Sequence, residues 1–261
     1  MIDVQKSKTR HQIAINRVGI SKIKYPIYVV DRKNENQQTI ADFTMSVDLP
    51  KEAKGTHMSR FIEILKCFHQ EINHKNLLTM IKETQIKLEA ENAFVKLEFP
   101  FFLDRKAPVT ESSALLDYEC WFECEGRGDN LALRLGVKVP VTSLCPCSKT
   151  ISKYGAHNQR GVITIDVEMS DTKEGKPNFI YFEELIDIAE QSASCKLYPI
   201  LKRPDEKYVT EFAYDNPVFV EDMVRNVAVR LDEDQRIESY KIHCENFESI
   251  HNHSAFAEIQ K

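Results

Sequence analysis

The sequence has no run of about eighteen apolar residues, the length that a membrane-spanning helix needs. Its first six residues also lack the apolar stretch of a secretory signal. We therefore expect a cytoplasmic protein that does not bind membranes. The cysteines number seven and include no CxxC pair, so we expect reduced thiols rather than a disulfide framework or a zinc knuckle.

A strong net charge is also absent. The formal charge is −5 and the pI is near 6.0, which gives no global attraction to nucleic acid. We expect no nucleic-acid partner, and an anionic ligand would need a local basic pocket. The 261 residues are 42% hydrophobic and contain no low-complexity linker, so they can bury one large core or two small ones.

The first half of the chain has clear periodic patterns. Residues 25–30 and 39–49 are rich in β-forming side chains and flank the turn-like segment 34–37, which predicts a β-hairpin. Apolar residues then recur at helical spacing over 61–68 and again over 77–88, which predicts two helices separated by a break near Asn73.

Alternation with a period of two follows these helices. Residues 93–99 alternate apolar and polar side chains, and 114–124 form another candidate strand. The predicted order of the first half is therefore ββααββ.

The second half repeats this order in its patterns. Two strands, two helices and two further strands are predicted over residues 131–139, 162–167, 182–189, 220–231, 239–244 and 255–259. Asn216 is the expected N-cap of the second helix, with Pro217 at its first position. We expect an α+β protein of two similar modules, residues 1–128 and 129–261.

One segment, residues 144–160, has no helical or strand period and is rich in reactive groups. It contains Cys145 and Cys147 on either side of a proline, followed by His157. A Cys-x-Cys pair can hold a metal or a reactive thiol, but two ordinary loop cysteines fit the spacing equally well. His157 is close enough along the chain to share an ion with Cys145, although nothing in the spacing requires it.

Two more polar segments accompany it. Residues 201–207 are charged and lie between the two predicted C-terminal helices, where a solvated helix-to-helix connection is the favoured interpretation. Residues 244–253 bring carboxylates and imidazoles between the last two strands, which also suits a polar hairpin loop. A mixed set of Cys, His and carboxylate groups would suit a catalytic rather than a structural zinc site.

Five stretches in order resemble the type IB GTP cyclohydrolase I family: residues 143–149, 154–160, 201–207, 216–222 and 246–253. The resemblance covers most of the chain and is strongest in the second half. It implies the tunnelling fold, with tandem ββααββ modules of antiparallel strands and helices packed on one face. It also implies conversion of GTP and water to 7,8-dihydroneopterin triphosphate and formate, the entry step to tetrahydrofolate, with a divalent metal.

The same resemblance implies roles for individual residues. The implied metal ligands are Cys145, His157, Glu206 and His251. The implied catalytic groups are Cys145, His157, Glu248 and His253. Glu221 is the implied anchor of the guanine base, although a carboxylate in the first turn of a helix is favourable in any case. The cations available for the triphosphate, besides Lys153, are Lys149, Arg160, Lys202, Arg203 and Lys207.

Zinc suits this ligand set best, and manganese or iron could occupy it. The resemblance further implies a homo-oligomer, expected as a tetramer with active sites between subunits. Three alternatives remain open. One is a tunnelling-fold nitrile reductase with a cysteine nucleophile and NADPH, and another is a non-catalytic pterin- or nucleotide-binding oligomer. The third is an archaeal-type cyclohydrolase that uses iron and makes a cyclic phosphate.

Overall fold

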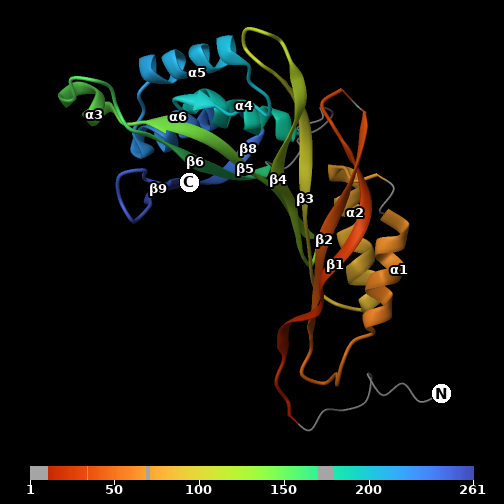
Figure 1. Cartoon of the computed structure of the whole chain (residues 1–261). Coiled ribbons are helices and arrows are strands. Elements are labelled where there is room, and N and C mark those ends of the chain that lie inside the picture. Colours follow the sequence, from red (N-terminus) through yellow and green to blue (C-terminus); the bar gives the residue numbers. More distant parts are fainter. Residues whose placement is uncertain (1–10, 34, 69–70, 170–178) are drawn as a thin grey trace. The chain divides into compact units, whose positions relative to one another are not determined.

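The computed structural model describes residues 11–33, 35–68, 71–169 and 179–261 (Figure 1). Its contacts divide the chain into two compact units. Unit 1 comprises Met1–Pro100 and Trp121–Leu135, and unit 2 comprises Phe101–Cys120 and Gly136–Lys261. The two modules 1–128 and 129–261 stay a prediction.

Unit 1 is built on a long antiparallel hairpin, as predicted. Strands β1 (Ile15–Val30) and β2 (Asn36–Leu49) pair antiparallel, and β2 pairs in turn with β3 (Asn92–Lys106). The fourth strand, β4 (Ser113–Arg127), lies next to β3. Alternate β2 side chains are buried because successive residues of a strand point to opposite faces.

Helices α1 (Met58–Phe68) and α2 (His74–Leu88) pack against this hairpin (Figure 1). The predicted break between them is confirmed. The side chain of Asn73 caps α2 by accepting a hydrogen bond from the Asn76 N–H at 2.9 Å. At the other end Glu89 adopts a left-handed conformation, with φ of 54°, that closes the helix.

Strands β3, β4 and β5 (Asn130–Leu144) contribute residues to both units. In unit 2 the strand order continues from β5 to β6 (Asn158–Met169), β8 (Ile237–Asn246) and β9 (Ala255–Gln260). The β6–β8 and β8–β9 pairs are antiparallel, and the short β7 (Cys195–Lys196) pairs with β5. Helix α4 (Phe182–Ser192) contacts β6, and helix α6 (Val220–Asp232) packs on β8 and β9 (Figure 1). The architecture is therefore α+β with antiparallel strand pairs.

The two helices predicted in the second half, over residues 182–189 and 220–231, are present as α4 and α6, but the prediction missed two others. The structure adds a short α3 (Pro146–Ile151) and a long α5 (Arg203–Asp215). Residues 201–207 are therefore mostly the start of a helix and not a connection. The apolar pattern missed α5 because this helix buries only Asp205 and Ala213, so it has no apolar stripe to detect.

The predicted start of the last helix is also wrong. Helix α6 begins at Val220 with Phe219 as its N-cap. Asn216 instead ends α5, where its N–H donates to the carbonyls of Phe212 and Ala213. The presence of α5 thus reverses the role of Asn216 from a helix start to a helix end.

A buried ionic cluster joins the strands of unit 2 to α4. The Arg105 guanidinium donates to Tyr118 Oη at 2.9 Å and to Glu190 Oε1 at 3.0 Å, and the Tyr118 hydroxyl donates to the same Glu190 oxygen at 2.7 Å. The Glu190 side chain is only 5% exposed. Burial raises the pKa of the Glu190 carboxyl, and the charge of Arg105 and the Tyr118 hydroxyl oppose this rise.

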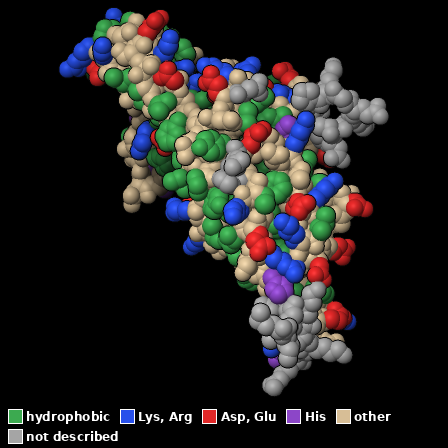
Figure 2. Space-filling model, turned by 90° about the vertical axis from the view of Figure 1, so that its right-hand side faces the viewer, with side chains coloured by type: hydrophobic (Ala, Val, Ile, Leu, Met, Phe, Trp, Pro, Cys, Tyr) green, Lys and Arg blue, Asp and Glu red, His purple; other side chains and the backbone are tan. Residues whose placement is uncertain are grey.

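Among the described residues, no helix is long and apolar enough to cross a membrane. Figure 2 shows acidic and basic side chains interspersed over the face that it presents. That face therefore lacks the uniform basic surface typical of nucleic-acid binding.

Candidate active site

A pocket of about 280 Å³ in unit 2 brings together one cysteine, three histidines and two glutamates that the sequence singled out. It lies where the ends of β5 and β8, the starts of β6, α6 and β9, and the loop between β8 and β9 meet. The residues that line it are Ser143, Cys145, His157, Gln159, Val218, Phe219, Val220, Glu221, Asn246, Glu248, His251, His253 and Ala255.

Cys145 and His157 are brought together by the turn that contains α3. Cys145 is the N-cap of α3, and its Sγ accepts a hydrogen bond from the Ser148 N–H at 3.5 Å. Its own N–H donates to the His157 carbonyl at 3.1 Å. The Ser148 hydroxyl donates to the Cys145 carbonyl and accepts from the His157 N–H, at 3.1 and 3.2 Å. The two residues at the ends of this turn thus share one wall of the pocket.

Behind this wall lies a network of buried polar side chains. His157 Nδ1 is 2.9 Å from Gln159 Oε1, and Gln159 Nε2 donates to Ser143 Oγ at 3.3 Å. Asn246 Nδ2 also donates to Ser143 Oγ, at 3.1 Å. Gln159, Ser143 and Asn246 are at most 7% exposed, so the network is shielded from water and holds the His157 ring on a rigid base.

The loop between β8 and β9 forms a further part of the pocket lining. Glu248 Oε2 lies 3.9 Å from His157 Nδ1, and Glu248 Oε1 lies 3.5 Å from Gln159 Nε2. His251 and His253 are exposed, and their rings stack with centroids 4.9 Å apart. This loop therefore offers a carboxylate and two imidazoles to the same cavity as Cys145 and His157.

Glu221 completes the lining from a different element. It stands in the first turn of α6, where the helix dipole favours a negative charge, and its side chain is exposed. A carboxylate in this position can accept two N–H bonds from a planar ligand that enters the pocket.

The structure does not bring every predicted site residue to this pocket. Glu206 is exposed on α5, pairs with Arg203 at 3.3 Å and is not among the lining residues. Cys147 is exposed on α3, outside the lining. The predicted phosphate-binding cations are also outside it: Lys149, Arg160, Lys202, Arg203 and Lys207.

Lys149 has a structural contact of its own. Its ammonium donates to the Tyr214 carbonyl and lies 4.3 Å from the centre of the Tyr214 ring, which ties α3 to the end of α5. Lys207 pairs loosely with Glu211 on the same helix, at 3.9 Å.

Asp205 fixes the start of α5, and therefore the placement of Glu206. Its buried carboxylate accepts from the N–H groups of Val109, Thr110 and Lys202 at 2.9 Å each, and from the Thr110 hydroxyl at 2.6 Å. Burial alone would raise the pKa of Asp205, but these hydrogen bonds hold it well below its usual value. The next residue along this anchored first turn is Glu206.

The donor set suits a divalent metal in its chemistry. A thiol, imidazoles and a carboxylate, all facing one cavity, are the ligand types of catalytic zinc sites. Within the described ranges, however, no three such side chains of a single chain stand close enough together to enclose an ion. A tight site would require a further ligand or a movement of the exposed loop.

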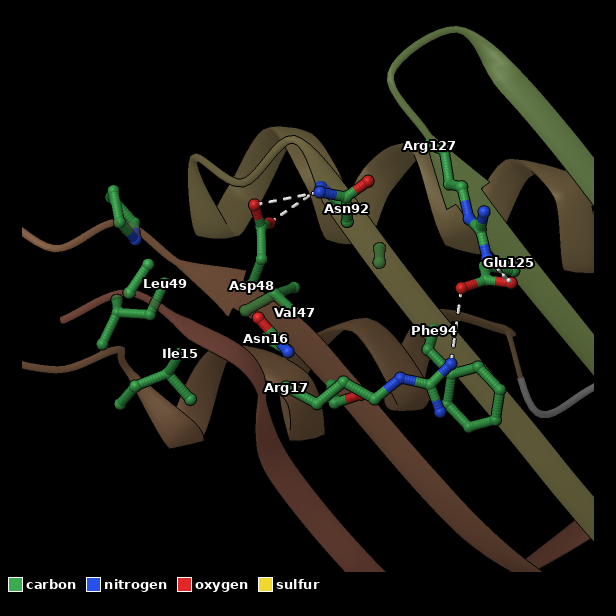
Figure 3. Close-up of a pocket in the computed structure, with 14 residues that line it drawn as sticks. Ile15, Asn16, Arg17, Val47, Asp48, Leu49, Asn92, Phe94, Glu125 and Arg127 are labelled. Carbon is green, nitrogen blue, oxygen red and sulfur yellow. Dashed lines mark hydrogen bonds and ion pairs between the residues drawn. The ribbon is translucent and has the colours of Figure 1, made fainter.

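Unit 1 has a pocket of a different character, with a volume of about 480 Å³ (Figure 3). Its charged groups are already paired: Arg17 with Glu125 at 3.3 Å, and Asp48 with the Asn92 backbone and side-chain amides at 2.8 and 3.1 Å. Its described lining contains neither cysteine nor histidine, so we assign it no part in catalysis.

Comparison with known proteins identifies the family. A model of the family described as type I GTP cyclohydrolase FolE2 matches residues 1–257. The chain belongs to this family. The curated relatives include the GTP cyclohydrolase FolE2 of Nitrosococcus oceani, which is 52% identical over 259 residues and is matched over 99% of this chain and 94% of its own length. The FolE2 of Thermosipho africanus is 48% identical over 257 residues, covering 98% of this chain and 96% of its own.

Solved structures show which fold this FolE2 family member has. Uricase from Arthrobacter globiformis matches with a TM-score of 0.57 at 10% identity, over 94% of this chain and 92% of its own. A mutant urate oxidase from Bacillus sp. TB-90 matches with a TM-score of 0.56 at 11% identity, over 95% and 99%. At such low identity the likeness concerns the fold alone, and it supports a fold of the uricase-like tunnelling type.

Sequence reasoning missed the buried amides of this FolE2 site. Gln159 and Asn246 lie inside motifs that the sequence analysis quoted, but neither was given a role. The sequence feature that could have identified Gln159 is the period of the strand. Gln159 and Gly161 occupy alternate, inward-facing positions of β6, where an apolar side chain would be expected. A polar residue at such a position needs a partner, which only the structure identifies.

Proposed function

We propose that the protein is a GTP cyclohydrolase I that converts GTP and water to 7,8-dihydroneopterin triphosphate and formate, the first step of tetrahydrofolate biosynthesis. One observation carries this proposal: in a chain of this family, a thiol, three imidazoles and two carboxylates line the same pocket. The finer assignments, to type IB and to two tandem ββααββ modules in a cytoplasmic protein, belong to the proposal and rest on the motifs and their order.

Cys145 and His157 would hold the metal, with His251 and Glu206 as further ligands. When bound, a divalent ion of this kind lowers the pKa of a water molecule and supplies hydroxide for attack on C8 of the purine. Zinc suits the ligand set, and manganese or iron could also occupy it.

The remaining lining residues would bind the base and move protons. Glu221 would accept hydrogen bonds from the guanine ring N–H and amino group, which orients C8 towards Cys145 and His157. Glu248 and His253 would transfer protons as the ring opens and formate leaves, and the support for these roles is that both line the same pocket as His157.

Binding of the triphosphate and of the metal would each need side chains that this pocket lacks, which favours a site shared between subunits. The described lining of the pocket contains no lysine or arginine, and Glu206 stands outside it. We propose a homotetramer in which Glu206 and some of the cations Lys149, Arg160, Lys202, Arg203 and Lys207 reach the pocket of a neighbouring copy. Exposed aromatic side chains on α5 and at the N-cap of α6, including Tyr208, Phe212 and Phe219, are available for such contacts.

The test is GTP turnover by metal-stripped protein, with zinc, manganese or ferrous iron restored separately, by measuring formate and the fluorescence of the oxidised pterin. We expect metal-dependent formate and neopterin, with both lost in Cys145→Ala. Metal-replete, folded protein that releases no formate would refute the proposal. Reduction of a nitrile by NADPH would then favour the nitrile reductase, and binding without turnover a pterin- or nucleotide-binding oligomer. Formate released with a cyclic phosphate product would identify the archaeal-type reaction.

A further inference from the structure

Gln159 is a buried side chain to which the proposed reaction gives no role, yet it contacts the His157 ring. It stands at the start of β6, is 7% exposed, and places its amide between the His157 ring, Ser143 and Glu248. The two ends of an amide differ in chemistry, since the oxygen only accepts and the nitrogen only donates. Which end faces His157 therefore decides which ring nitrogen carries the proton.

The surroundings fix the orientation of this amide. The Ser143 hydroxyl has one proton, which it donates to the Val218 carbonyl at 3.2 Å. Ser143 Oγ is then only an acceptor for its two amide neighbours, Asn246 Nδ2 at 3.1 Å and Gln159 Nε2 at 3.3 Å. The Glu248 carboxylate, 3.5 Å from the same Gln159 nitrogen, also only accepts. Both neighbours therefore require the NH₂ group on that side.

This leaves Gln159 Oε1 facing His157 Nδ1 at 2.9 Å. An oxygen cannot donate, so the bond forms only when Nδ1 carries the proton. In the neutral ring the other nitrogen, Nε2, is then unprotonated. The described residues give Nε2 no hydrogen-bond partner, so its lone pair remains available.

We propose that Gln159 is a positioning residue that holds neutral His157 as the Nδ1–H tautomer, so that Nε2 is the atom presented to the metal. The inference rests on the proposed function for the ligand role of His157, but the tautomer itself does not depend on it. Partners of this kind, bonded to the far nitrogen of a ligating histidine, typically change metal affinity by about 10- to 100-fold when removed.

The decisive measurement is the ¹⁵N spectrum of the histidine rings in full-length, metal-free protein at alkaline pH, which distinguishes the two neutral tautomers. We expect wild-type His157 to be almost entirely Nδ1–H. A wild-type ring with its proton on Nε2 would overturn the proposal, and this result needs no variant to fold.

Two matched variants test whether Gln159 or Glu248 fixes the proton on His157 Nδ1. Gln159→Leu removes the acceptor at nearly constant volume, and Glu248→Leu removes the carboxylate 3.9 Å from the same nitrogen. We expect Gln159→Leu to shift the ring towards Nε2–H and Glu248→Leu to leave it unchanged. If Gln159→Leu kept the Nδ1–H form, or if Glu248→Leu caused the shift, Gln159 would not be the positioning residue.

Zinc affinity, measured by competition with a chelator, tests the link to the metal. We expect about a 10- to 100-fold loss of zinc affinity in Gln159→Leu, because the ring then presents Nε2–H instead of the Nε2 lone pair. If the tautomer changes while zinc affinity stays constant, the ligand role of His157 fails and the positioning of its proton stands. Together the two readouts distinguish an error in this inference from an error in the proposed function.

Discussion

Replacing Arg105 by methionine would leave the Glu190 carboxylate buried without its cation. The Glu190 side chain is 5% exposed, and Arg105 supplies both a charge at 3.0 Å and a second bond to Tyr118. Removing one partner of a buried ion pair costs about 3–5 kcal/mol, because the remaining charge is neither solvated nor paired. We expect Arg105→Met to lose stability on this scale near pH 8.

The loss should depend on pH with a definite sign. Burial already raises the pKa of Glu190 and Arg105 lowers it, so the variant raises this pKa further. An acid whose folded-state pKa is raised favours folding below its unfolded pKa, near 4.3, and loses that contribution as pH rises through the folded value. The gap between wild type and Arg105→Met should therefore narrow as the pH falls towards about 4.5.

Glu190→Gln is the matched control. The amide keeps an oxygen for the Tyr118 hydroxyl but carries no charge, so adding Arg105→Met to it should cost only about 1 kcal/mol. The assay is urea unfolding followed by circular dichroism for the two single variants and the double variant at both pH values. Equal costs for Arg105→Met in both backgrounds, or a gap that widens at low pH, would refute the reasoning.

Three further changes test the site and its supports. Gly161→Ala places a Cβ 2.4 Å from Asn246 Oδ1, so we expect the free energy of unfolding to fall by about 1–3 kcal/mol and the melting temperature to fall with it. An unchanged melting temperature would contradict the close packing of β6 on β8. In Asp205→Asn the free energy of unfolding should fall less steeply as the pH is lowered, because the lowered pKa of Asp205 stabilises the wild-type fold above about pH 3.9 and this contribution is lost as pH falls. Equal pH midpoints of acid unfolding for wild type and variant would argue against this reasoning. Both Glu221→Ala and Glu221→Gln should raise the KM for GTP, because an amide offers one acceptor where the guanine ring N–H and amino group need two, and an unchanged KM in Glu221→Gln would contradict its role as the guanine anchor.

The apolar patterns predicted the elements that pack against a core. The β1–β2 hairpin and helices α1, α2, α4 and α6 each bury one face, and that face is readable as a period in the sequence. Helix α5 was not predicted because its first turn is held in place by hydrogen bonds to Asp205 and not by an apolar stripe. The mistaken N-cap at Asn216 followed from that one omission.

The sequence by itself determined the family of this protein and the segments that carry its reactive groups, because motif order and residue identity are properties of the chain alone. Only the tertiary structure decided which of those groups meet. It placed Cys145, His157, Glu221 and the β8–β9 loop around one cavity, and left Glu206 outside it. It also turned Gln159 into a partner of His157, since a hydrogen bond depends on distance and direction in space, which spacing along the chain does not give.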